Sequence, residues 1–328
     1  MLLQHIYEQY GISCYYDRTE QGSLLRSGDW YLFPIPVSSF RERSIEVLAY
    51  VSNYMRDQGE ENVAQIMVTR GGEYISVYQG DSLVFLAAPV TLKNSHLTGE
   101  ALARFHRLTQ MDSNAYRNDR PYLNWSELWQ HRADQTLNWV MESFKSDTQT
   151  DFEQKLLKIY PYYAGRAENA IQYSVDLSMD APIDEGATLC HYRIRRSMWG
   201  EKEGYIKWPT EWLVDHPGRD LGEYLRAVCW EGEINVDEIR DFITSYKRIK
   251  PISQVGASLA YTRLLFPLPF FETVEGYYSG NWNEEESLQA LERCERVSKK
   301  EEELLTLFEK IELSPIYLVD WLKPERVH

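Results

Sequence analysis

The chain has 328 residues, enough for two domains or one two-lobed unit, and 43% of them are hydrophobic, so it can bury a substantial core. Its formal net charge is −15 and its isoelectric point is near 5.0. Nucleic acids and anionic membrane surfaces are bound by basic patches, so this balance argues against both as partners.

The compartment is indicated by what the sequence lacks. Its four cysteines are far apart and form no Cys-x-x-Cys pair, which favours free thiols over a zinc site or a disulfide framework. The start, MLLQHIYEQYG, has no basic region followed by a long apolar run, so we expect no signal peptide and synthesis in the cytoplasm. No window of about 18 apolar residues exists, so we expect no membrane span.

The first 90 residues predict strands and one helix. Residues 12–37 favour short strands, the last of which, WYLFPIPV, should end at its prolines. Ser38 or Ser39 should cap a helix over about 40–57. Three further strands follow, VAQIMVT, EYISVYQ and SLVFLAAPV; Gly71-Gly72 favours a hairpin between the first two, and the chain turns again at Gly80-Asp81.

After Pro89 the pattern becomes mostly helical. We expect helices in HLTGEALARFHRLT, over 125–144, and over about 151–176 with a possible break at Pro161. Two short strands are expected at about 187–191 and 204–208. Further helices follow from Arg219 onward, while FPLPFFETVEGYYSG has the prolines and glycines of an irregular crossing and the acidic run that includes KKEEE suits a final, solvated helix.

This order is not the alternation of strands and helices that builds a doubly wound sheet. It predicts an α+β fold with a small β-rich lobe at 1–90 and a larger, mostly helical lobe at 91–328.

Four local patterns, taken in order, resemble the protein-kinase-like fold and above all its aminoglycoside-phosphotransferase branch. They are the strands and helix before residue 57, the strand SLVFLAAPV in the place of a hinge, the helix GEALARFHRLT, and the series LCHYRIRRSM, YIKW and GRDLGEYL. Within that branch the chain is similar to the CotS/YutH family of Bacillus-type spore coat-associated proteins. The resemblance implies the spore coat as location and other coat proteins as partners.

The resemblance also assigns catalytic positions. A carboxylate that accepts the substrate proton corresponds to Arg193, two residues after His191; a metal-binding Asn corresponds to Met198, and a metal-binding Asp to Lys207. Arginine cannot accept a proton, and loss of a general base costs about 10²- to 10⁴-fold in rate. A thioether and an ammonium are poor partners for Mg²⁺.

The small lobe also lacks a residue that the family uses. The resemblance places an ATP-contacting lysine on the strand WYLFPIPV, and this strand contains no lysine. We therefore expect no catalytic residue, no metal and no cofactor, with bulky side chains such as Phe33 and Pro34 on part of the ATP path. The leading hypothesis is a non-catalytic structural or assembly protein.

Two alternatives remain open. One is a pseudo-enzyme that binds a nucleotide or another anion at Arg193 and Lys207 without metal. The other is an active small-molecule phosphotransferase with relocated acidic residues, such as Asp215, while Asp220 would serve as a helix cap. At the level of single side chains, His191 can equally be a core histidine, and the arginines at 193, 195 and 196 a solvated or salt-bridged loop.

Overall fold

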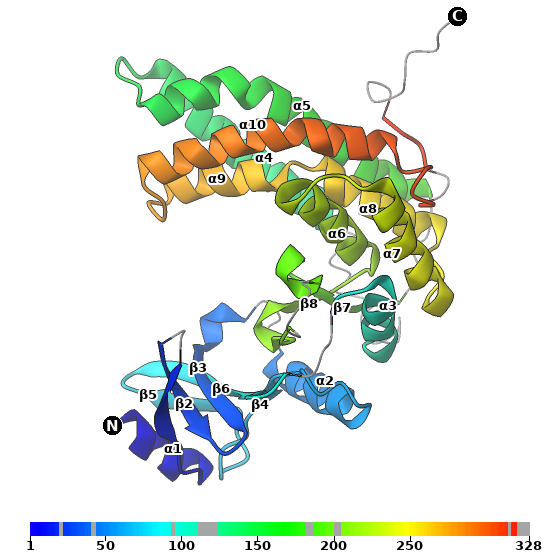
Figure 1. Cartoon of the computed structure of the whole chain (residues 1–328). Helices are drawn as coiled ribbons and strands as arrows, with labels where there is room; N and C mark the ends of the chain where they lie inside the picture. Colours follow the sequence, from blue (N-terminus) through cyan, green and yellow to red (C-terminus); the bar gives the residue numbers. More distant parts are fainter. Residues whose placement is uncertain are drawn as a thin grey trace, which may run out of the picture. The chain divides into compact units, whose positions relative to one another are not determined.

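The computed structural model describes residues 1–19, 22–40, 44–92, 96–110, 124–180, 186–199, 205–313 and 316–319 (Figure 1). The chain forms two compact units. We call Met1–Thr109 with Leu189–Val214 the sheet unit, and Gln110–Thr188 with Asp215–His328 the helical unit. A small antiparallel sheet followed by a larger helical part confirms the predicted α+β class. The lobe boundary at residue 90 stays a prediction.

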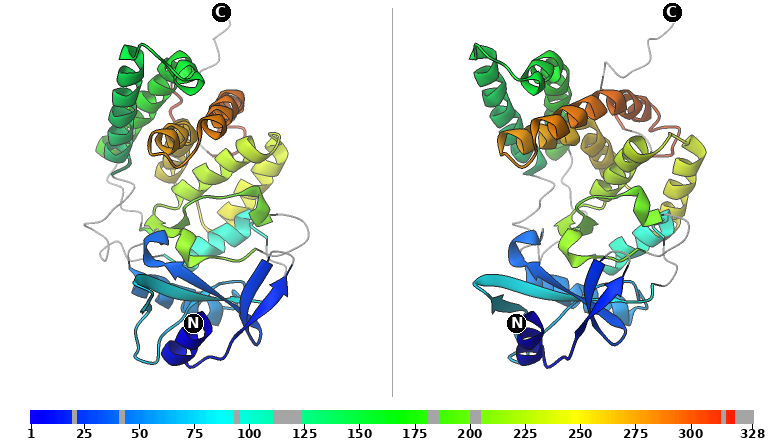
Figure 2. Two further views of the ribbon diagram at one scale, coloured as in Figure 1. Left: turned by 90° about the vertical axis from the view of Figure 1, so that its left-hand side faces the viewer. Right: turned by 60° about the vertical axis from the view of Figure 1, so that its left-hand side comes forward.

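The sheet unit is built on antiparallel strands in the order β1-β2-β3-β6, and β6 pairs on its other side with both β4 and β5 (Figure 2). The strands are β1 (Tyr15–Thr19), β2 (Gly22–Ser27), β3 (Trp30–Pro36), β4 (Gln65–Ile66), β5 (Ile75–Tyr78) and β6 (Asp81–Pro89). The expected hairpin between the first two of the three strands is therefore wrong: both lie against β6. The turn at Gly80 is confirmed, with Gln79 and Gly80 both at positive φ, as a two-residue hairpin requires.

A first helix, α1 (Leu2–Tyr10), was not expected from the sequence. Its Ile6 and Tyr10 join Phe85 and neighbouring strand residues in one apolar cluster, so α1 covers a face of the sheet (Figure 2). Gly11 ends the helix at φ 72°, where its N–H donates to the carbonyl of Tyr7. The consecutive residues 83–86 of β6 are all buried. Because successive side chains of a strand point to opposite faces, both faces of this part of the central strand are covered.

Strand β3 continues through Pro34 and ends at Pro36, so the expected end at the prolines is confirmed at the second of them. The pairing of β2 with β3 ends at Leu25 opposite Leu32, whereas β6 pairs with β3 as far as Leu83 opposite Pro36. Pro34 and Pro36 therefore stand where β3 has a neighbour on one side only, and this is where a sheet tolerates a missing N–H.

Helix α2 (Ile45–Asp57) begins later than predicted. Ser44 is its N-cap and accepts the N–H of Val47, while Val37–Ser39 form a separate 3-10 turn. Helix α3 (Gly99–Leu108) lies where it was expected, capped by Thr98. In both helices a hydroxyl satisfies an N–H that the first turn leaves without a partner.

The two short strands expected after α5 (Asp151–Asp180) differ from their prediction. Strand β7 (Thr188–His191) pairs with β8 (Trp212–Asp215), and the predicted strand at 204–208 contributes a single parallel bridge between Lys207 and Val63. Pro209 follows at once and, lacking an N–H, cannot continue a ladder.

The helical unit contains α4 (Trp125–Lys145), α5 (Asp151–Asp180), α6 (Gly218–Glu231), α7 (Val236–Ile249), α8 (Gln254–Leu265), α9 (Leu268–Tyr278) and α10 (Glu284–Thr306). Helices α4, α5, α9 and α10 run side by side (Figures 1 and 2). Helix α5 continues through Pro161. The expected irregular crossing at 266–280 is wrong, because it contains α9, which Pro267 precedes and which packs its phenylalanines inward.

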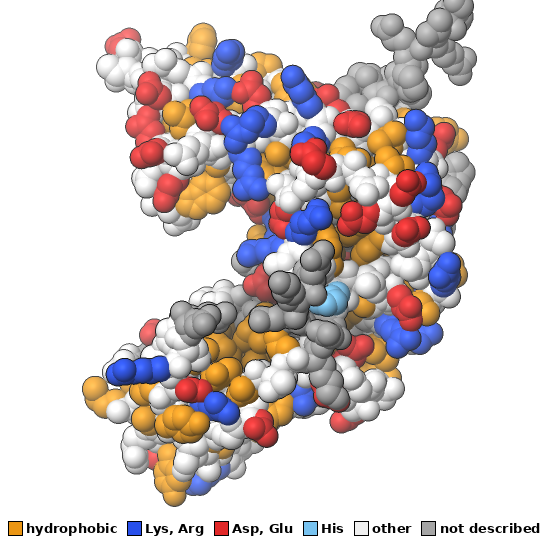
Figure 3. Space-filling view, viewed as in Figure 1, with side chains coloured by type: hydrophobic (Ala, Val, Ile, Leu, Met, Phe, Trp, Pro, Cys, Tyr) orange, Lys and Arg blue, Asp and Glu red, His pale blue; other side chains and the backbone are white. Residues whose placement is uncertain are grey.

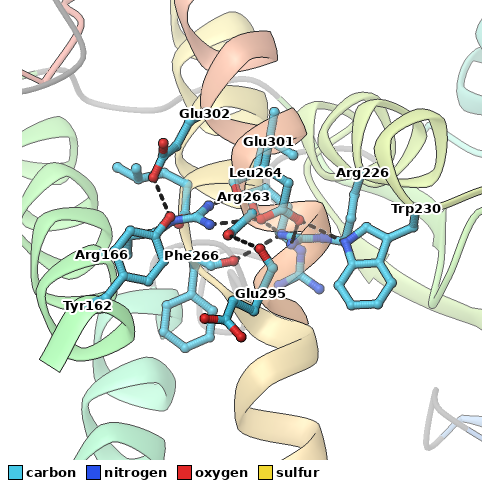
Figure 4. A network of polar contacts seen from close by, with 12 residues as sticks. Tyr162, Arg166, Arg226, Trp230, Arg263, Leu264, Phe266, Glu295, Glu301 and Glu302 are labelled. Atoms are coloured by element: carbon cyan, nitrogen blue, oxygen red, sulfur yellow. Dashed lines mark hydrogen bonds and ion pairs between the residues drawn. The ribbon is translucent and has the colours of Figure 1, made fainter. Parts of the chain in front are cut away.

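The centre of the helical unit holds a buried ionic network (Figure 4). Glu301 of α10, 3% exposed, binds Arg166 of α5 at 2.9 Å and Arg226 of α6 at 3.2 Å. Both guanidinium groups also donate to carbonyls where α8 ends, among them Leu265 for Arg166 and Phe266 for Arg226. Three helices thus meet at one carboxylate, and the two arginines connect it to the end of α8. The expectation that KKEEE forms a solvated face is therefore wrong at Glu301.

The surface of the helical unit carries both signs of charge interspersed, as Figure 3 shows. None of the helices in the described ranges is long and apolar enough to cross a lipid bilayer.

Candidate functional site

The segment that the resemblance aligned with a catalytic loop starts where β7 ends and belongs to the sheet unit. Its first residue, Tyr192, donates its N–H to the carbonyl of Glu211 at 2.6 Å, just before β8. The loop closes in a 3-10 turn over Arg196–Trp199, where the carbonyl of Met198 accepts the N–H of Leu97 at 2.7 Å. Backbone bonds therefore hold both ends of the loop.

His191 lies inside the core of the sheet unit. Its side chain is buried, and its ring lies 4.7 Å from the ring of Phe105 on α3. Phe105 contacts Trp212 of β8 at 5.5 Å on another side. This aromatic cluster attaches α3 to the β7–β8 hairpin and is the environment of a core histidine.

Arg193, which the resemblance aligned with the catalytic base, packs against its neighbour Tyr192. The guanidinium of Arg193 lies 4.5 Å from the ring centre of Tyr192 and donates to the carbonyl of the same residue at 2.8 Å. A cation over an aromatic face is attracted by the ring quadrupole. The arginines at 195 and 196 are exposed.

Lys207 is buried and ion-paired. Its side chain is 5% exposed, and its Nζ donates to Glu60 Oε2 at 2.7 Å. Its backbone is held from both sides, because its N–H donates to Asn62 and its carbonyl accepts the N–H of Ala64. The segment after α2 therefore supplies both the bridge and the counter-charge for this ammonium.

The residue after Lys207 covers strand β3. The ring of Trp208 lies 5.0 Å from that of Phe33 and nearly perpendicular to it, at 87°. A bulky aromatic pair thus occupies this stretch of β3, where the family pattern expects the ATP-contacting lysine. Edge-to-face geometry of this kind is favourable for aromatic rings.

Asp215, the candidate for a relocated metal ligand, lies in the helical unit and is 1% exposed. One oxygen accepts the indole N–H of Trp125 at 3.1 Å and the guanidinium of Arg219 at 3.2 Å; the other accepts the N–H of His216 at 2.7 Å. Protein donors therefore occupy both oxygens. Asp220 lies in the first turn of α6, whose N-cap is Pro217, so its interpretation as the cap is wrong.

Sequence reasoning named the aligned positions but missed their partners. Glu60 precedes Lys207 by 147 residues, and Trp125 precedes Asp215 by 90. No local pattern marks either pair. Together, the aligned positions offer a guanidinium, a thioether and an ammonium, a donor set that suits no hard divalent cation.

Two solved structures show what fold this is. An aminoglycoside phosphotransferase from Alicyclobacillus acidocaldarius matches 92% of this chain and 93% of its own at 13% identity, with a TM-score of 0.68. A spectinomycin phosphotransferase bound to ADP and spectinomycin matches 90% of this chain and 97% of its own at 15% identity, with a TM-score of 0.57. At these identities the likeness establishes the phosphotransferase fold alone.

A closer relative comes from the curated proteins. The endospore coat-associated protein YutH of Bacillus subtilis (strain 168) is 32% identical over 287 residues, which is 85% of this chain and 84% of that protein. Residues 3–309 match the profile of the family described as "Spore coat putative kinase YutH". The resemblance inferred from the sequence is thereby confirmed, and the chain belongs to the YutH family of spore coat proteins.

Proposed function

We propose that this chain is a catalytically inactive kinase-fold protein that acts as a structural or assembly component of the endospore coat, together with other coat proteins. The coat role is supported by the relative in Bacillus subtilis, which is itself coat-associated. Phosphotransferases of the same fold include active enzymes, so the inactivity must be argued from the residues at the site.

The ion pair between Lys207 and Glu60 is the observation that carries the proposal. In an active phosphotransferase of this fold the aligned residue is a carboxylate that binds Mg²⁺. Here a buried ammonium lies at that position and is neutralised by a carboxylate 2.7 Å away. A single ammonium and a divalent cation about 4 Å apart would repel by roughly 8 kcal/mol at an effective dielectric of 20.

The two alternatives fit the contacts less well. An anion pocket at Arg193 and Lys207 needs the charge of the ammonium, which Glu60 already compensates. A relocated metal site at Asp215 needs a carboxylate oxygen, and the hydrogen bonds of Asp215 to Trp125, Arg219 and His216 engage both. A cation there would have to displace Arg219 from a site that is 1% exposed.

The test is phosphate transfer from ATP with Mg²⁺ by the purified protein, measured against a panel of small hydroxylated and amino compounds. We expect no turnover, and none after Arg193→Asp, because the metal position stays defective. Turnover that depends on Mg²⁺ and disappears in Asp215→Asn would contradict the proposal.

The coat role needs its own measurement. A fluorescent fusion of the wild-type chain and of Arg193→Asp should reach the coat of developing spores equally, because localisation then depends on the folded surface and not on catalysis. A fusion that stays diffuse in the mother cell while remaining folded would contradict a coat role.

A further inference from the structure

The second half of helix α4 carries an apolar stripe that the fold leaves uncovered. Leu137, Met141 and Phe144 follow one another at spacings of four and three residues, so their side chains lie in line on one face of the helix. They are 43%, 45% and 70% exposed, respectively. Single exposed apolar side chains are ordinary, but a contiguous apolar face marks an interaction surface. In both views of Figure 2, α4 lies at the outer side of the helical unit.

This stripe is separate from the face that α4 uses inside the fold. Ser143 donates to Glu153 of α5 at 3.0 Å, and the ring of Trp139 stacks on that of Tyr278 of α9 at 4.9 Å. At about 100° per residue, the buried side chains of α4 lie roughly a quarter turn or more around the helix from the centre of the stripe. Those buried residues are Trp125, Trp129, Thr136, Val140 and Ser143. Helix α4 therefore has a second apolar face that none of these contacts uses.

Two opposite charges border the stripe on the same side. Asp134 precedes Leu137 by one turn, and Lys145 directly follows Phe144. At about 100° per residue, both lie roughly 50–75° to one side of the centre of the stripe. Both side chains are exposed, and Asp134 accepts a hydrogen bond from Gln130 at 2.8 Å. Within the described ranges, neither Asp134 nor Lys145 forms an ion pair.

These positions make the face complementary to itself. In a two-fold symmetric pair, a residue i that contacts j also has j contacting i. For two antiparallel copies of α4 with the axis beside the middle of the stripe, between residues 140 and 141, Leu137 of each copy faces Phe144 of the other. At a rise of about 1.5 Å per residue, Asp134 then lies about 3 Å along the helix axis from Lys145 of the second copy, within reach of a lysine side chain. Such an axis keeps the same flank of both helices together, so this acid and base meet twice.

We propose that the stripe of Leu137, Met141 and Phe144 is the docking site for a second copy of this chain, packed antiparallel through α4. Burial of the three apolar side chains of each copy supplies the driving force. The two pairs between Asp134 and Lys145 set the orientation, because charges at the rim of an interface contribute more to specificity than to affinity. A contact of one helix face per copy is smaller than the roughly 800 Å² per partner of a stable interface, so the association is weak and depends on concentration.

The experiment is sedimentation equilibrium of the purified full chain at concentrations from about 1 to about 200 µM. Met141→Glu and Phe144→Glu each place a charge on the stripe. Leu128→Glu is the matched control, because Leu128 is on the same helix and 57% exposed, but lies about 180° around the helix from Leu137. Circular dichroism and thermal melting establish that each variant is folded.

We expect a reversible monomer–dimer equilibrium for the wild type, a dissociation constant at least tenfold higher in Met141→Glu and Phe144→Glu, and no change in Leu128→Glu. A monomer throughout the concentration range, unchanged association in the folded stripe variants, or an equal loss in Leu128→Glu would overturn the proposal.

A charge exchange tests the antiparallel arrangement. Asp134→Lys and Lys145→Asp should each weaken the association several-fold, because each brings like charges together, and the double variant should recover it. A double variant as weak as the single ones would overturn the proposed packing. The measurement requires neither ATP nor spore material, so its result is independent of whether the kinase positions are inactive and of the coat role.

Discussion

At the scale of the residue, the buried ammonium of Lys207 has its counter-charge from the carboxylate of Glu60. Lys207 is 5% exposed, and the side chain of Glu60 is 27% exposed. Removing one partner of a buried ion pair leaves an uncompensated charge at a cost of about 3–5 kcal/mol. The partial exposure of Glu60 reduces that figure in the variant that keeps Glu60.

We therefore predict that Glu60→Gln lowers the free energy of unfolding by about 2–4 kcal/mol, because it leaves the ammonium of Lys207 buried without its counter-charge. Lys207→Met should cost less, since Glu60 can turn toward water. Urea unfolding measures both, with Lys145→Met as the exposed control. A negligible change in the free energy of unfolding of both variants would show that the ion pair does not contribute to stability.

A second prediction tests whether the carboxylate of Asp215 has a structural or a catalytic role. Asp215→Asn removes the charge that Arg219 needs and should destabilise the helical unit by about 3 kcal/mol. Addition of Mg²⁺ should leave the melting temperature of the wild type unchanged. A stable Asp215→Asn protein that has lost a Mg²⁺-dependent stabilisation would contradict the structural role.

The sequence predicted the identity of these residues but not their contacts. Arg193 and Lys207 could be assigned because short patterns such as LCHYRI and YIKW keep their order along the chain. Glu60 and Trp125 could not, because ion pairs and hydrogen bonds form between side chains that only the tertiary fold brings together.

At the scale of the element, the end of α8 is the feature that joins the helices. Its last carbonyls lack partners within the helix and are bound by Arg166 and Arg226 instead. Glu301 balances this charge from α10 and also accepts the indole N–H of Trp230 at 2.9 Å. One carboxylate thus accepts from three side chains.

Glu301→Gln should lower the free energy of unfolding by about 3–5 kcal/mol, because two buried guanidinium groups lose their counter-charge. Glu303→Gln, an exposed position on the same helix, should change it by less than about 0.5 kcal/mol. Guanidinium-induced unfolding followed by circular dichroism compares the two. Similar midpoints for both variants would show that the network adds no stability.

Helices with clear periodicity were predicted well, and α7 lies in the region from Arg219 onward where further helices were expected. The errors have physical causes. In α9 the sequence shows prolines and glycines, yet Pro267 precedes the helix and Gly276 gives room to the ring of Trp282. Glu301 was predicted to be solvated, because the sequence alone does not distinguish a buried glutamate from an exposed one. The difference arises only when the helix packs against its neighbours.

At the scale of the whole molecule, tyrosines with raised pKa values link stability to alkaline pH. Burial raises the pKa of Tyr261, which is fully buried, to about 12, and partial burial raises that of Tyr173 in the same direction. In the unfolded chain the phenols ionise near pH 10. The folded chain then holds protons that the unfolded chain releases, so this stability is complete below about pH 10 and is lost as pH rises toward 12.

Thermal melting between about pH 9 and pH 12 should therefore show a falling midpoint above about pH 10. In Tyr261→Phe the fall should be shallower, although its starting stability is lower because the hydroxyl accepts the N–H of Val319. A midpoint that stays constant across this range would contradict the burial of these phenols as a source of stability.

The fold of the whole chain was predictable from the order of its elements. A β-rich start, a helix such as α3 after the hinge-like strand, and a short hairpin before α6 fall in the order of the phosphotransferase fold, and the comparisons confirm it. Helix α1 was missed because nine residues at a chain end carry little periodicity. Its apolar side chains acquire a role only when the sheet is present.

We propose above that this kinase fold has lost the chemistry of its site. Calorimetric titration of the wild-type chain with ATP in excess Mg²⁺ tests it most directly, with a spectinomycin phosphotransferase of the same fold as the positive control. We expect no Mg²⁺-dependent heat of binding, because the proposal places the buried ammonium of Lys207 at the metal position and Trp208 packs on Phe33 of β3. Micromolar binding of ATP that requires Mg²⁺ would contradict it.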